Sequence, residues 1–354
     1  MIDLDDERAL RSVDAGGMLA AIAALGDHAR RGYATGLAAQ GLPSVDGVTA
    51  VTFCGMGGSA VAGDVLRSVF RERLNVPVDV NRSPTLPAYC GPHTLVVVSS
   101  YSGNTAETLA CFREAVARGC RLIAVTSGGA LATEAASAGA GLVTVPGGFQ
   151  PRAALGWLAF PSLGALETAG LLPDLAADVE ETVTELTTLA SRLGPAIPAR
   201  ENLAKELAHR LADRIPVIWG ADGIGAVAAT RWKTQFNENG KTPSFASAMS
   251  ELDHNELVGW LRPSGELFAV IALRHDGEDP ELARRFPLSL DVARDAGAHI
   301  EEFRGAGRAP LAQLFSLIAL GDFASTYLAL RRGVDPTPVA AIDRLKAALA
   351  DGTA

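Results

Sequence analysis

The sequence predicts an α/β protein with two doubly wound parallel-sheet domains, each a three-layer α/β/α arrangement, and flanking helices. Short apolar runs alternate with helical patterns, which is the order expected of a parallel sheet. The strand–glycine–helix pattern of residues 51–62 (VTFCGMGGSAVA) returns at 217–228 (VIWGADGIGAVA). This repeat suggests two similarly folded halves, although generic βα turns could also produce it. Apolar residues make up 48% of the 354 residues, enough for a sizeable core.

The first half of the chain begins with apolar residues at helical spacing over 6–31, followed by a linker at 36–47. Five short apolar runs come next, with helical patterns between them. We expect strands at 49–54, 76–80, 95–98, 122–126 and 141–145, and a helix that follows the first strand to about residue 70.

The second half begins with helical patterns at 153–170 and 174–193 and a break at 195–198. We then expect strands at 215–219, 267–273 and 299–303, helices at 224–236 and 280–295, an apolar helix at 311–330 and an amphipathic helix at 338–349. The predicted division is 1–44 (N-terminal helix and linker), 45–165 (first domain), 166–200 (connecting helices), 201–335 (second domain) and 336–354 (C-terminal helix).

Charge and cysteine spacing exclude several classes of protein. The net charge of −9 argues against nucleic acid as the main partner, because binding to a phosphate backbone needs clustered Lys and Arg. It does not exclude a small anionic substrate. The four cysteines lack Cys-x-x-Cys spacing, which favours core thiols in a reducing compartment over a disulfide framework or a zinc site. We expect no metal and no cofactor.

Residues 311–330 are the one segment long and apolar enough to raise the question of a membrane. Asp322 lies near its middle, where a charge is costly in a membrane span. A buried helix is therefore the prediction. The acidic N-terminus is not followed by an apolar stretch typical of a secretory signal, so we expect a cytoplasmic protein with no membrane partner.

Two loops that follow predicted strands are rich in glycine and hydroxyl residues: 55–59 (GMGGS) and 99–105 (SSYSGNT). Each lies where a helix begins, and backbone N–H groups there, with hydroxyls beside them, are a natural anion site. We interpret 99–105 as a phosphate-binding loop. An ordinary N-cap by Ser102 or Asn104 is the alternative. The second half has no such hydroxyl cluster, so we expect one phosphate site per chain.

Residues 55–60 also fit a loosened dinucleotide fingerprint, Gly-x-Gly-x-x-Ala. Asp79 lies 24 residues beyond Gly55, where a ribose-binding acid would sit. An oxidoreductase, or a tight βα turn without a ligand, therefore stays open from this motif alone. The hydroxyls of 99–105 have no role in an oxidoreductase of this kind.

Candidate proton-transfer residues occur in the second half, in 231–241 (RWKTQFNENGK) and 251–256 (ELDHNE). A carboxylate and an imidazole that reach one pocket can move protons at neutral pH, which makes Glu238 and His254 candidates for general acid–base catalysis. The alternatives are a solvated helix end for Glu238 and a structural, hydrogen-bonding role for His254.

The two hydroxyl-rich loops together resemble those of the sugar isomerase (SIS) domain family, over about residues 45–165, and the second half resembles a degenerate second copy. The resemblance implies two SIS-type domains and a site for the phosphate of a phosphosugar. The residues that it assigns to this phosphate site are Gly58, Ser59, Ser100, Ser102 and Thr105.

From about residue 45 to the end, the order of motifs resembles the bifunctional phosphoglucose/phosphomannose isomerases, a SIS family of archaea and bacteria. The resemblance implies a homodimer that acts on hexose 6-phosphates without a metal. Glu238 would shuttle a proton between C1 and C2 through a cis-enediol(ate), and Arg152 would stabilise the enediolate. His254, contributed by the other subunit, would assist ring opening, and Lys346 matches the family's active-site lysine.

The predicted function is therefore an aldose–ketose isomerase that interconverts glucose 6-phosphate, and mannose 6-phosphate if there is room beside C2, with fructose 6-phosphate. A non-catalytic sugar-phosphate sensor is the main alternative, which Glu238 and the absence of a DNA-binding segment disfavour. A glutamine-dependent aminotransferase is disfavoured by Ile2 in place of a nucleophilic Cys.

Overall fold

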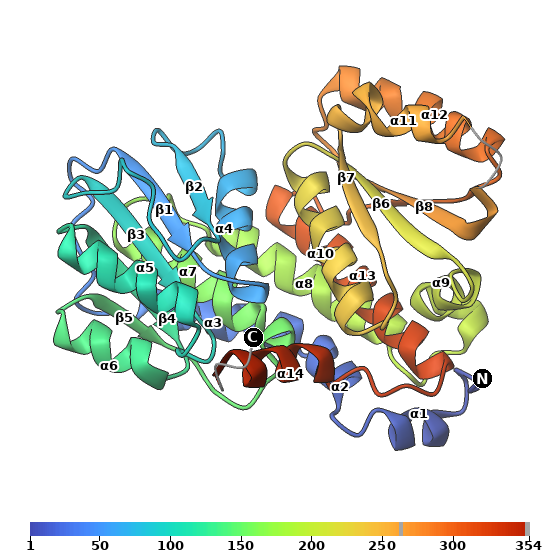
Figure 1. The fold of residues 1–354 in the computed structure, drawn as a ribbon, viewed down its shortest axis with the longest axis horizontal. Helices are drawn as coiled ribbons and strands as arrows, with labels where there is room; N and C mark the ends of the chain where they lie inside the picture. The colour runs from blue at the N-terminus through green and yellow to red at the C-terminus, as the bar shows by residue number, and fades with distance from the viewer. Residues whose placement is uncertain (262–264, 351–354) are drawn as a thin grey trace.

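The computed structural model of the chain describes residues 1–261 and 265–350. It contains two parallel sheets, one from each half of the chain, with helices packed between them (Figure 1). The largest cluster of buried apolar side chains runs through both halves without interruption. The predicted α/β architecture with two similarly folded halves is confirmed.

The first sheet has the order β2-β1-β3-β4-β5, and all four strand pairs are parallel. Its strands are β1 (Ala50–Cys54), β2 (Val78–Asn81), β3 (Thr94–Ser99), β4 (Arg121–Thr126) and β5 (Gly141–Thr144). Alternate residues of β3 face opposite layers: Val97 lies in the main core, whereas Val96 and Val98 lie in a second core with α5 (Ala106–Ala117) and α6 (Gly129–Ser137). Helices therefore cover both faces, as the near-continuous apolar strands require.

The second sheet has the order β7-β6-β8-β9, again all parallel. Its strands are β6 (Ile215–Ala221), β7 (Phe245–Met249), β8 (Phe268–Arg274) and β9 (His299–Arg304), and the helices of this half include α9 (Leu203–Arg210), α10 (Ile224–Glu238), α11 (Glu256–Gly259) and α12 (Pro280–Asp295). This order matches β2-β1-β3-β4 of the first sheet, strand for strand. In this correspondence β6 is the counterpart of β1, and α10 is the counterpart of α4 (Gly58–Val69).

A layer of long helices joins the two sheets. It includes α3 (Leu25–Leu37), α7 (Gly156–Thr168), α8 (Ala176–Leu193) and α13 (Pro310–Arg331). Helices α3 and α7 approach closely at glycines, since a Cβ at Gly164 would lie 2.5 Å from the carbonyl oxygen of Tyr33. Helix α13 is apolar and long enough to cross a membrane, but its most apolar stretch is wholly buried within the protein, as core helices are. The prediction of a buried helix at 311–330 is confirmed.

The single N-terminal helix predicted at 6–31 is wrong. The segment forms α1 (Glu7–Val13), α2 (Met18–Ala23) and the start of α3. The first break occurs because the Asp14 carboxylate accepts hydrogen bonds from the N–H groups of Met18 and Leu19, at 2.7 and 2.9 Å, and Gly17 takes a left-handed φ of 68°. A capping carboxylate and a left-handed residue end one helix and start another.

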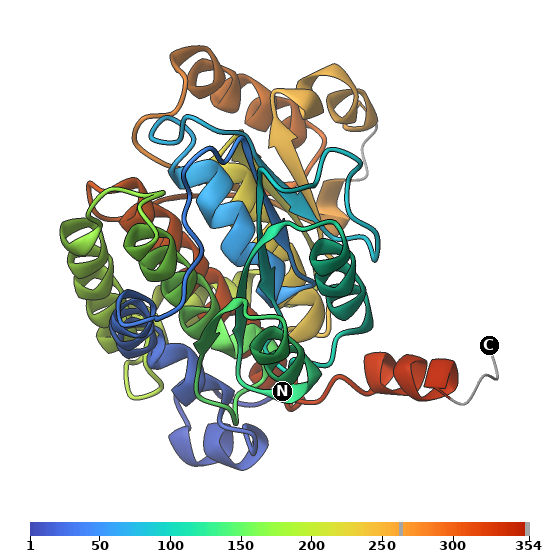
Figure 2. The same cartoon turned by 90° about the vertical axis from the view of Figure 1, so that its left-hand side faces the viewer.

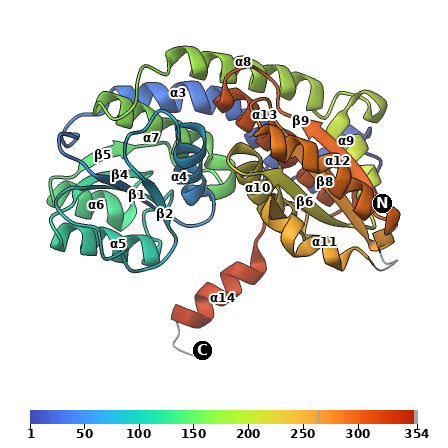
Figure 3. The same cartoon turned by 90° about the horizontal axis from the view of Figure 1, so that it is seen from above.

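Other predicted elements were incomplete. The sequence pattern did not predict β7, α9 or the short α11, and the predicted helix at 153–170 included part of the 3₁₀ turn Pro151–Ala154 before α7. The last helix is α14 (Ala340–Ala350), which projects from the body of the protein (Figures 2 and 3). All four cysteines are free, and only Cys120 is partly exposed, in agreement with the prediction of core thiols.

Candidate active site

The two predicted phosphate loops meet at the carboxyl edge of the first sheet. Ser59 and Ser100 are both buried there. The Ser59 hydroxyl accepts a hydrogen bond from the backbone N–H of Tyr101 at 3.3 Å, and the Ser100 hydroxyl donates to Thr105 Oγ1 at 3.1 Å. The β1–α4 and β3–α5 loops are therefore joined into one polar surface.

The helix starts beside these hydroxyls have no side-chain caps. Thr105, not Ser102 or Asn104, is the N-cap of α5, and it makes no capping hydrogen bond. Ser102 Oγ accepts from the N–H of Asn104, and Asn104 Oδ1 accepts from the N–H of Ala130. The first N–H groups of α5 therefore remain open to an anion, whereas at the start of α4 the N–H groups of Ser59 and Ala60 already donate to the carbonyls of Met56 and Gly57, at 3.0 and 3.1 Å. The capping alternative for Ser102 and Asn104 is thus wrong.

Arg152 lies beside these loops, in the 3₁₀ turn after β5, with only 3% of its side chain exposed. A Cβ at Gly58 would lie 3.4 Å from Arg152 Cα, so the start of α4 rests directly on this turn. The guanidinium donates from Nε to Asn239 Oδ1 at 2.6 Å and from Nη2 to the carbonyls of Pro336 and Thr337, both at 2.8 Å. These three bonds fix its orientation.

The remaining guanidinium nitrogen of Arg152, Nη1, faces Glu238. It lies 3.8 Å from Glu238 Oε2 and has no hydrogen-bond acceptor among the described residues. Burial lowers the pKa of Arg152, although the charge of Glu238 opposes this shift. The guanidinium is still a cation, since arginine does not lose its proton in proteins. A charged N–H donor and a carboxylate thus face the same space.

Glu238 is the last residue of α10, and its side chain is 31% exposed. The Lys241 ammonium caps this end of the helix by donating to the carbonyl of Glu238 at 2.6 Å. It also donates to the carbonyls of Pro336, at 3.0 Å, and Pro338. Burial, followed by the charge of Arg152, lowers the pKa of Lys241. The solvated-helix-end alternative does not describe Glu238, which pairs with a buried cation.

A buried ion pair lies behind Arg152. Arg231 donates to both oxygens of Asp322, at 3.1 and 2.7 Å, and also to the carbonyl oxygen of Arg152 at 2.7 Å. Both side chains are almost completely buried. The Asn239 amide donates in turn to Ser325 Oγ at 3.4 Å. Helix α13, which supplies Asp322 and Ser325, therefore supports the backbone and the side chain of Arg152 through α10.

His254 and Lys346 do not join this cluster within one chain. The N–H of Asp222, at the start of α10, bonds to the carbonyl of Met249, so the segment that carries His254 lies at the opposite end of α10 from Glu238. The 15 residues of α10 span about 22 Å. Both His254 and Lys346 are exposed, and Lys346 lies on the projecting helix α14.

Four side chains that build this site were not predicted from the sequence: Asn239, Arg231, Asp322 and Lys241. Arg231, Asn239 and Lys241 were all in the quoted motif 231–241, but only Glu238 was given a role there. Asp322 was noticed only as a charge within an apolar helix. A buried Asp needs a cation, and this rule could have pointed to a partner such as Arg231.

The dinucleotide interpretation gains no support from the structure. Asp79 is the second residue of β2, not its carboxyl end, and its carboxylate accepts a hydrogen bond from the Tyr89 hydroxyl at 3.1 Å. Among residues 1–261 and 265–350, no group of three or more His, Cys, Asp or Glu side chains is placed to hold a metal.

Comparison with known proteins gives two family matches. Residues 49–138 match the SIS domain, and residues 200–349 match the bacterial phospho-glucose isomerase C-terminal SIS domain. A bifunctional phosphoglucose/phosphomannose isomerase from Caldicellulosiruptor bescii is 42% identical over 304 residues, which cover 85% of this chain and 89% of that protein.

Two further proteins are similar to the chain. A D-glucosamine-6-phosphate 4-epimerase from Sulfolobus acidocaldarius is 30% identical, over 68% of this chain and 74% of the relative. A solved structure of a glucose-6-phosphate isomerase-like protein from Thermus thermophilus has a TM-score of 0.63 at 22% identity, and the match covers 98% of this chain and 99% of that one. This structural likeness shows the shared fold.

Proposed function

Because the chain belongs to the bifunctional phosphoglucose/phosphomannose isomerase family, we propose that it interconverts glucose 6-phosphate and mannose 6-phosphate with fructose 6-phosphate. The observation that carries the proposal is the pair formed by Glu238 and Arg152 Nη1, 3.8 Å apart, beside an uncapped, hydroxyl-lined pair of helix starts. An isomerase of this class needs a base, a cation for an oxyanion and a grip on the phosphate, and these three lie together.

The phosphate grip orients the sugar. The phosphate accepts hydrogen bonds from the hydroxyls of Ser59, Ser102 and Thr105, and from Ser100 once its hydroxyl turns away from Thr105. It also accepts from the N–H of Gly58 and from the first N–H groups of α5. Binding energy from this remote group holds C1 and C2 against Glu238. The net charge of −9 does not oppose this, because the helix starts and Arg152 supply a local positive field.

The proton transfer uses a single carboxylate. Glu238 removes the proton from C2 of the aldose, and the electron pair forms a cis-enediolate with its charge on O1. The hydroxyl proton of O2 passes to O1, and the protonated Glu238 returns its proton to C1 to give the ketose. Negative charge develops on the oxygen at C1 during this step. Arg152 Nη1 donates to that oxygen without reorganisation, because Nε and Nη2 are already fixed.

Ring opening uses His254 of a second copy in a homodimer, with Lys346 as an assisting group. The length of α10 separates His254 from Glu238 within one chain, and the exposure of His254 suits a residue that enters a partner's site. We place the enzyme in the cytoplasm, without a metal or a cofactor. The predicted division at 44, 165, 200 and 335 is retained as part of this proposal.

The decisive experiment supplies fructose 6-phosphate to the purified chain and follows glucose 6-phosphate and mannose 6-phosphate by NMR. We expect both products, and the same rate after dialysis against a chelator. A parallel arm with glucosamine 6-phosphate tests epimerisation at C4, because one relative is named for it. Turnover in that arm alone would replace the isomerase by an epimerase. Binding of fructose 6-phosphate without turnover would favour the sensor.

A further inference from the structure

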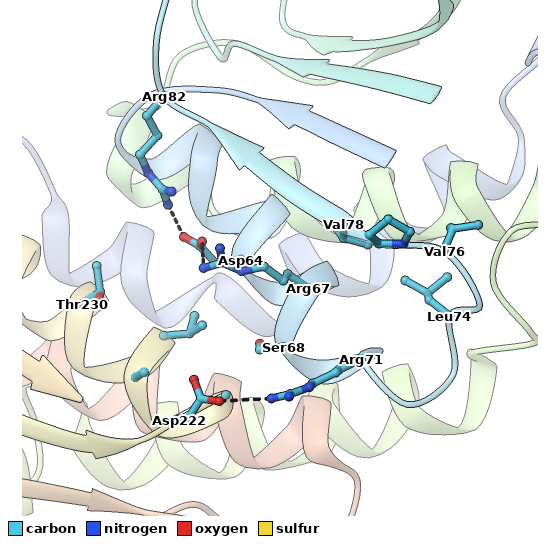
Figure 4. A pocket seen from close by; sticks show the side chains of 14 residues that line it. Asp64, Arg67, Ser68, Arg71, Leu74, Val76, Val78, Arg82, Asp222 and Thr230 are labelled. Atoms are coloured by element: carbon cyan, nitrogen blue, oxygen red, sulfur yellow. Dashed lines mark hydrogen bonds and ion pairs between the residues drawn. The ribbon is translucent and has the colours of Figure 1, made fainter. Parts of the chain in front are cut away.

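We propose that the chain has a second anion site, which binds a phosphate monoester in a cavity between the two halves of the molecule. The cavity has a volume of about 670 Å³ and lies between the end of α4 and the start of α10 (Figure 4). We call it the arginine pocket, and define it by Asp64, Arg67, Arg71, Arg82, Asp222 and Gly223. It goes beyond the proposed isomerase function and shares no residue with that site.

The arginine pocket is the counterpart of the active site in the repeat of the two halves. Helices α4 and α10 follow the equivalent strands β1 and β6 and run in opposite directions. The start of α4, at Gly58, rests on Arg152, which bonds Asn239 at the end of α10. Arg71, just beyond α4, bonds Asp222, just before α10, at 3.1 Å. Each site therefore combines the start of one helix with the end of the other.

The charges in the pocket favour an anion. Arg67 and Arg82 share a single buried carboxylate, Asp64, whose side chain is 7% exposed. This carboxylate holds both guanidinium groups at one wall of the cavity, as Figure 4 shows. With Arg71 and Asp222, the pocket contains three cations and two carboxylates. Guanidinium groups bind phosphate through paired N–H donors, and these three remain partly exposed to the cavity.

The start of α10 adds open N–H donors. Gly223 is its N-cap and lines the cavity, but no side chain caps the helix. The neighbouring carboxylate of Asp222 pairs with Arg71 and leaves the N–H groups open. A helix of 15 residues carries about half a positive charge at this end. Arginines from the first half and N–H groups from the second therefore converge on the same space.

The shape of the pocket indicates a metabolite and not a bare ion. Its volume lies in the range of small-molecule sites. Leu74, Val76 and Val78 of the first half line the pocket beside the guanidinium groups, and Val227 of α10 adds apolar lining from the second half. An apolar lining beside guanidinium groups suits the ring of a sugar phosphate or of a nucleoside monophosphate. Both are phosphate monoesters, and this is the class that we assign.

The pocket binds without catalysis, because the groups that react in the active site have no counterpart here. The last residue and the C-cap of α4 are Val69 and Phe70, whereas those of α10 are Glu238 and Asn239. A second site departs from the expectation of one phosphate site per chain, which counted hydroxyl-rich loops alone. The anion donors of the second site come from arginines of the other half, which no single loop motif contains.

Equilibrium binding to the full chain tests the proposal, with inorganic phosphate, fructose 6-phosphate and adenosine 5′-monophosphate as probes. We expect two equivalents of at least one ester per chain. Arg67→Ala with Arg71→Ala should remove one equivalent or weaken it at least tenfold, and should leave turnover of fructose 6-phosphate unchanged. Ser100→Ala should weaken only the other equivalent. The ester whose binding Arg67→Ala with Arg71→Ala weakens shows whether the pocket takes a sugar phosphate or a nucleoside monophosphate.

The control is Arg30→Ala, since Arg30 forms a comparable exposed pair with Glu180 at 2.8 Å, outside the pocket. It should keep both equivalents. The proposal is overturned if no probe has an equivalent that Arg67→Ala with Arg71→Ala removes or weakens, or if Arg30→Ala weakens binding as much as the pocket variants do. Circular dichroism of each variant shows whether it has folded. Binding to the pocket is scored without turnover, so its failure is distinct from a failure of the isomerase assay.

Discussion

Replacing Glu238 by Gln should abolish most of the isomerase activity and leave the fold intact. The substitution removes one charge and almost no volume from the last residue of α10. The carbonyl of Glu238 keeps its bond from Lys241, because the backbone is unchanged. We expect kcat for fructose 6-phosphate to fall by about 10²- to 10⁴-fold, the usual contribution of a general base.

The structure indicates that this loss is much larger than the change in stability. Two unit charges 3.8 Å apart attract by about 1 kcal/mol in water and about 4 kcal/mol at a protein surface. Glu238 is 31% exposed, and Arg152 keeps three hydrogen bonds to neutral acceptors. The net loss in unfolding free energy should therefore be at most about 1 kcal/mol. The expected loss in kcat corresponds to about 3–5 kcal/mol of barrier.

Three measurements separate these effects. Urea unfolding gives the stability, steady-state assays give kcat, and NMR in D₂O gives the exchange of the C1 proton of fructose 6-phosphate with solvent. The exchange reports proton abstraction directly, even when the product does not form. Glu206→Gln is the matched control, because Glu206 pairs with Arg210 at 2.9 Å on the surface.

Two results would refute the reasoning. If kcat of Glu238→Gln stays within tenfold of the wild type, or C1 exchange persists at the wild-type rate, another group removes the proton. If the unfolding free energy falls by about 3 kcal/mol or more along with the activity, the role of Glu238 is structural: the carboxylate would then be the main counter-ion of buried Arg152.

Three further predictions concern other parts of the molecule. Burial lowers the pKa of His28 below its ordinary 6.5, so the unfolded chain takes up a proton that the folded chain does not. The unfolding free energy should therefore fall as the pH drops below about 6.5, by up to about 1.4 kcal/mol per pH unit. This fall should be smaller in His28→Gln, and as large as in the wild type in the control His93→Gln, because His93 is exposed. Glu238→Gln and His254→Ala should each be inactive, and a mixture that exchanges subunits should recover about a quarter of the activity if His254 acts across the dimer; no recovery would place both groups in one chain. Gly164→Ala should cost about 1–3 kcal/mol in urea unfolding, because its Cβ would overlap the α3 backbone.

Much of the fold could be predicted because buried parallel strands leave a strong signal. Residues 94–99 and 121–126 are nearly continuous apolar runs, and both were found. Strand β7 was missed since it lies at the sheet edge and needs no apolar run: Phe245 is exposed, residues 246–248 are small, and only Met249 is fully buried. The break after α1 was missed because it depends on a capping bond from Asp14, which helical periodicity does not contain.

The site could be predicted only in part, for a related reason. Loop motifs indicate candidate ligand-binding residues, and these can be recognised because they lie close together in the sequence. The support of Arg152 comes from residues 79 to 185 positions away, such as Arg231 and the carbonyls of Pro336 and Thr337. No local pattern contains such contacts, because they depend on how α10 and α13 pack against the first half.

The opposed directions of α4 and α10 explain how two similar halves come to form the one proposed catalytic site. At the first sheet, the loop after β3 supplies hydroxyls to the start of α4. At the second sheet, the equivalent loop after β8 carries Glu278. Both oxygens of its carboxylate accept hydrogen bonds of 2.7–3.1 Å from the Arg274 guanidinium. The loop after β8, residues 275–279, therefore offers an anion no hydroxyls. The end of α10 meets the hydroxyl-lined edge and carries Glu238, whereas the end of α4 meets the other edge and is followed by Arg71. Of the two helices, only α10 ends in a carboxylate, and only α4 starts beside hydroxyls. Because α4 and α10 run in opposite directions, Glu238 lies beside those hydroxyls, and a cationic cavity is left where α4 ends and α10 begins.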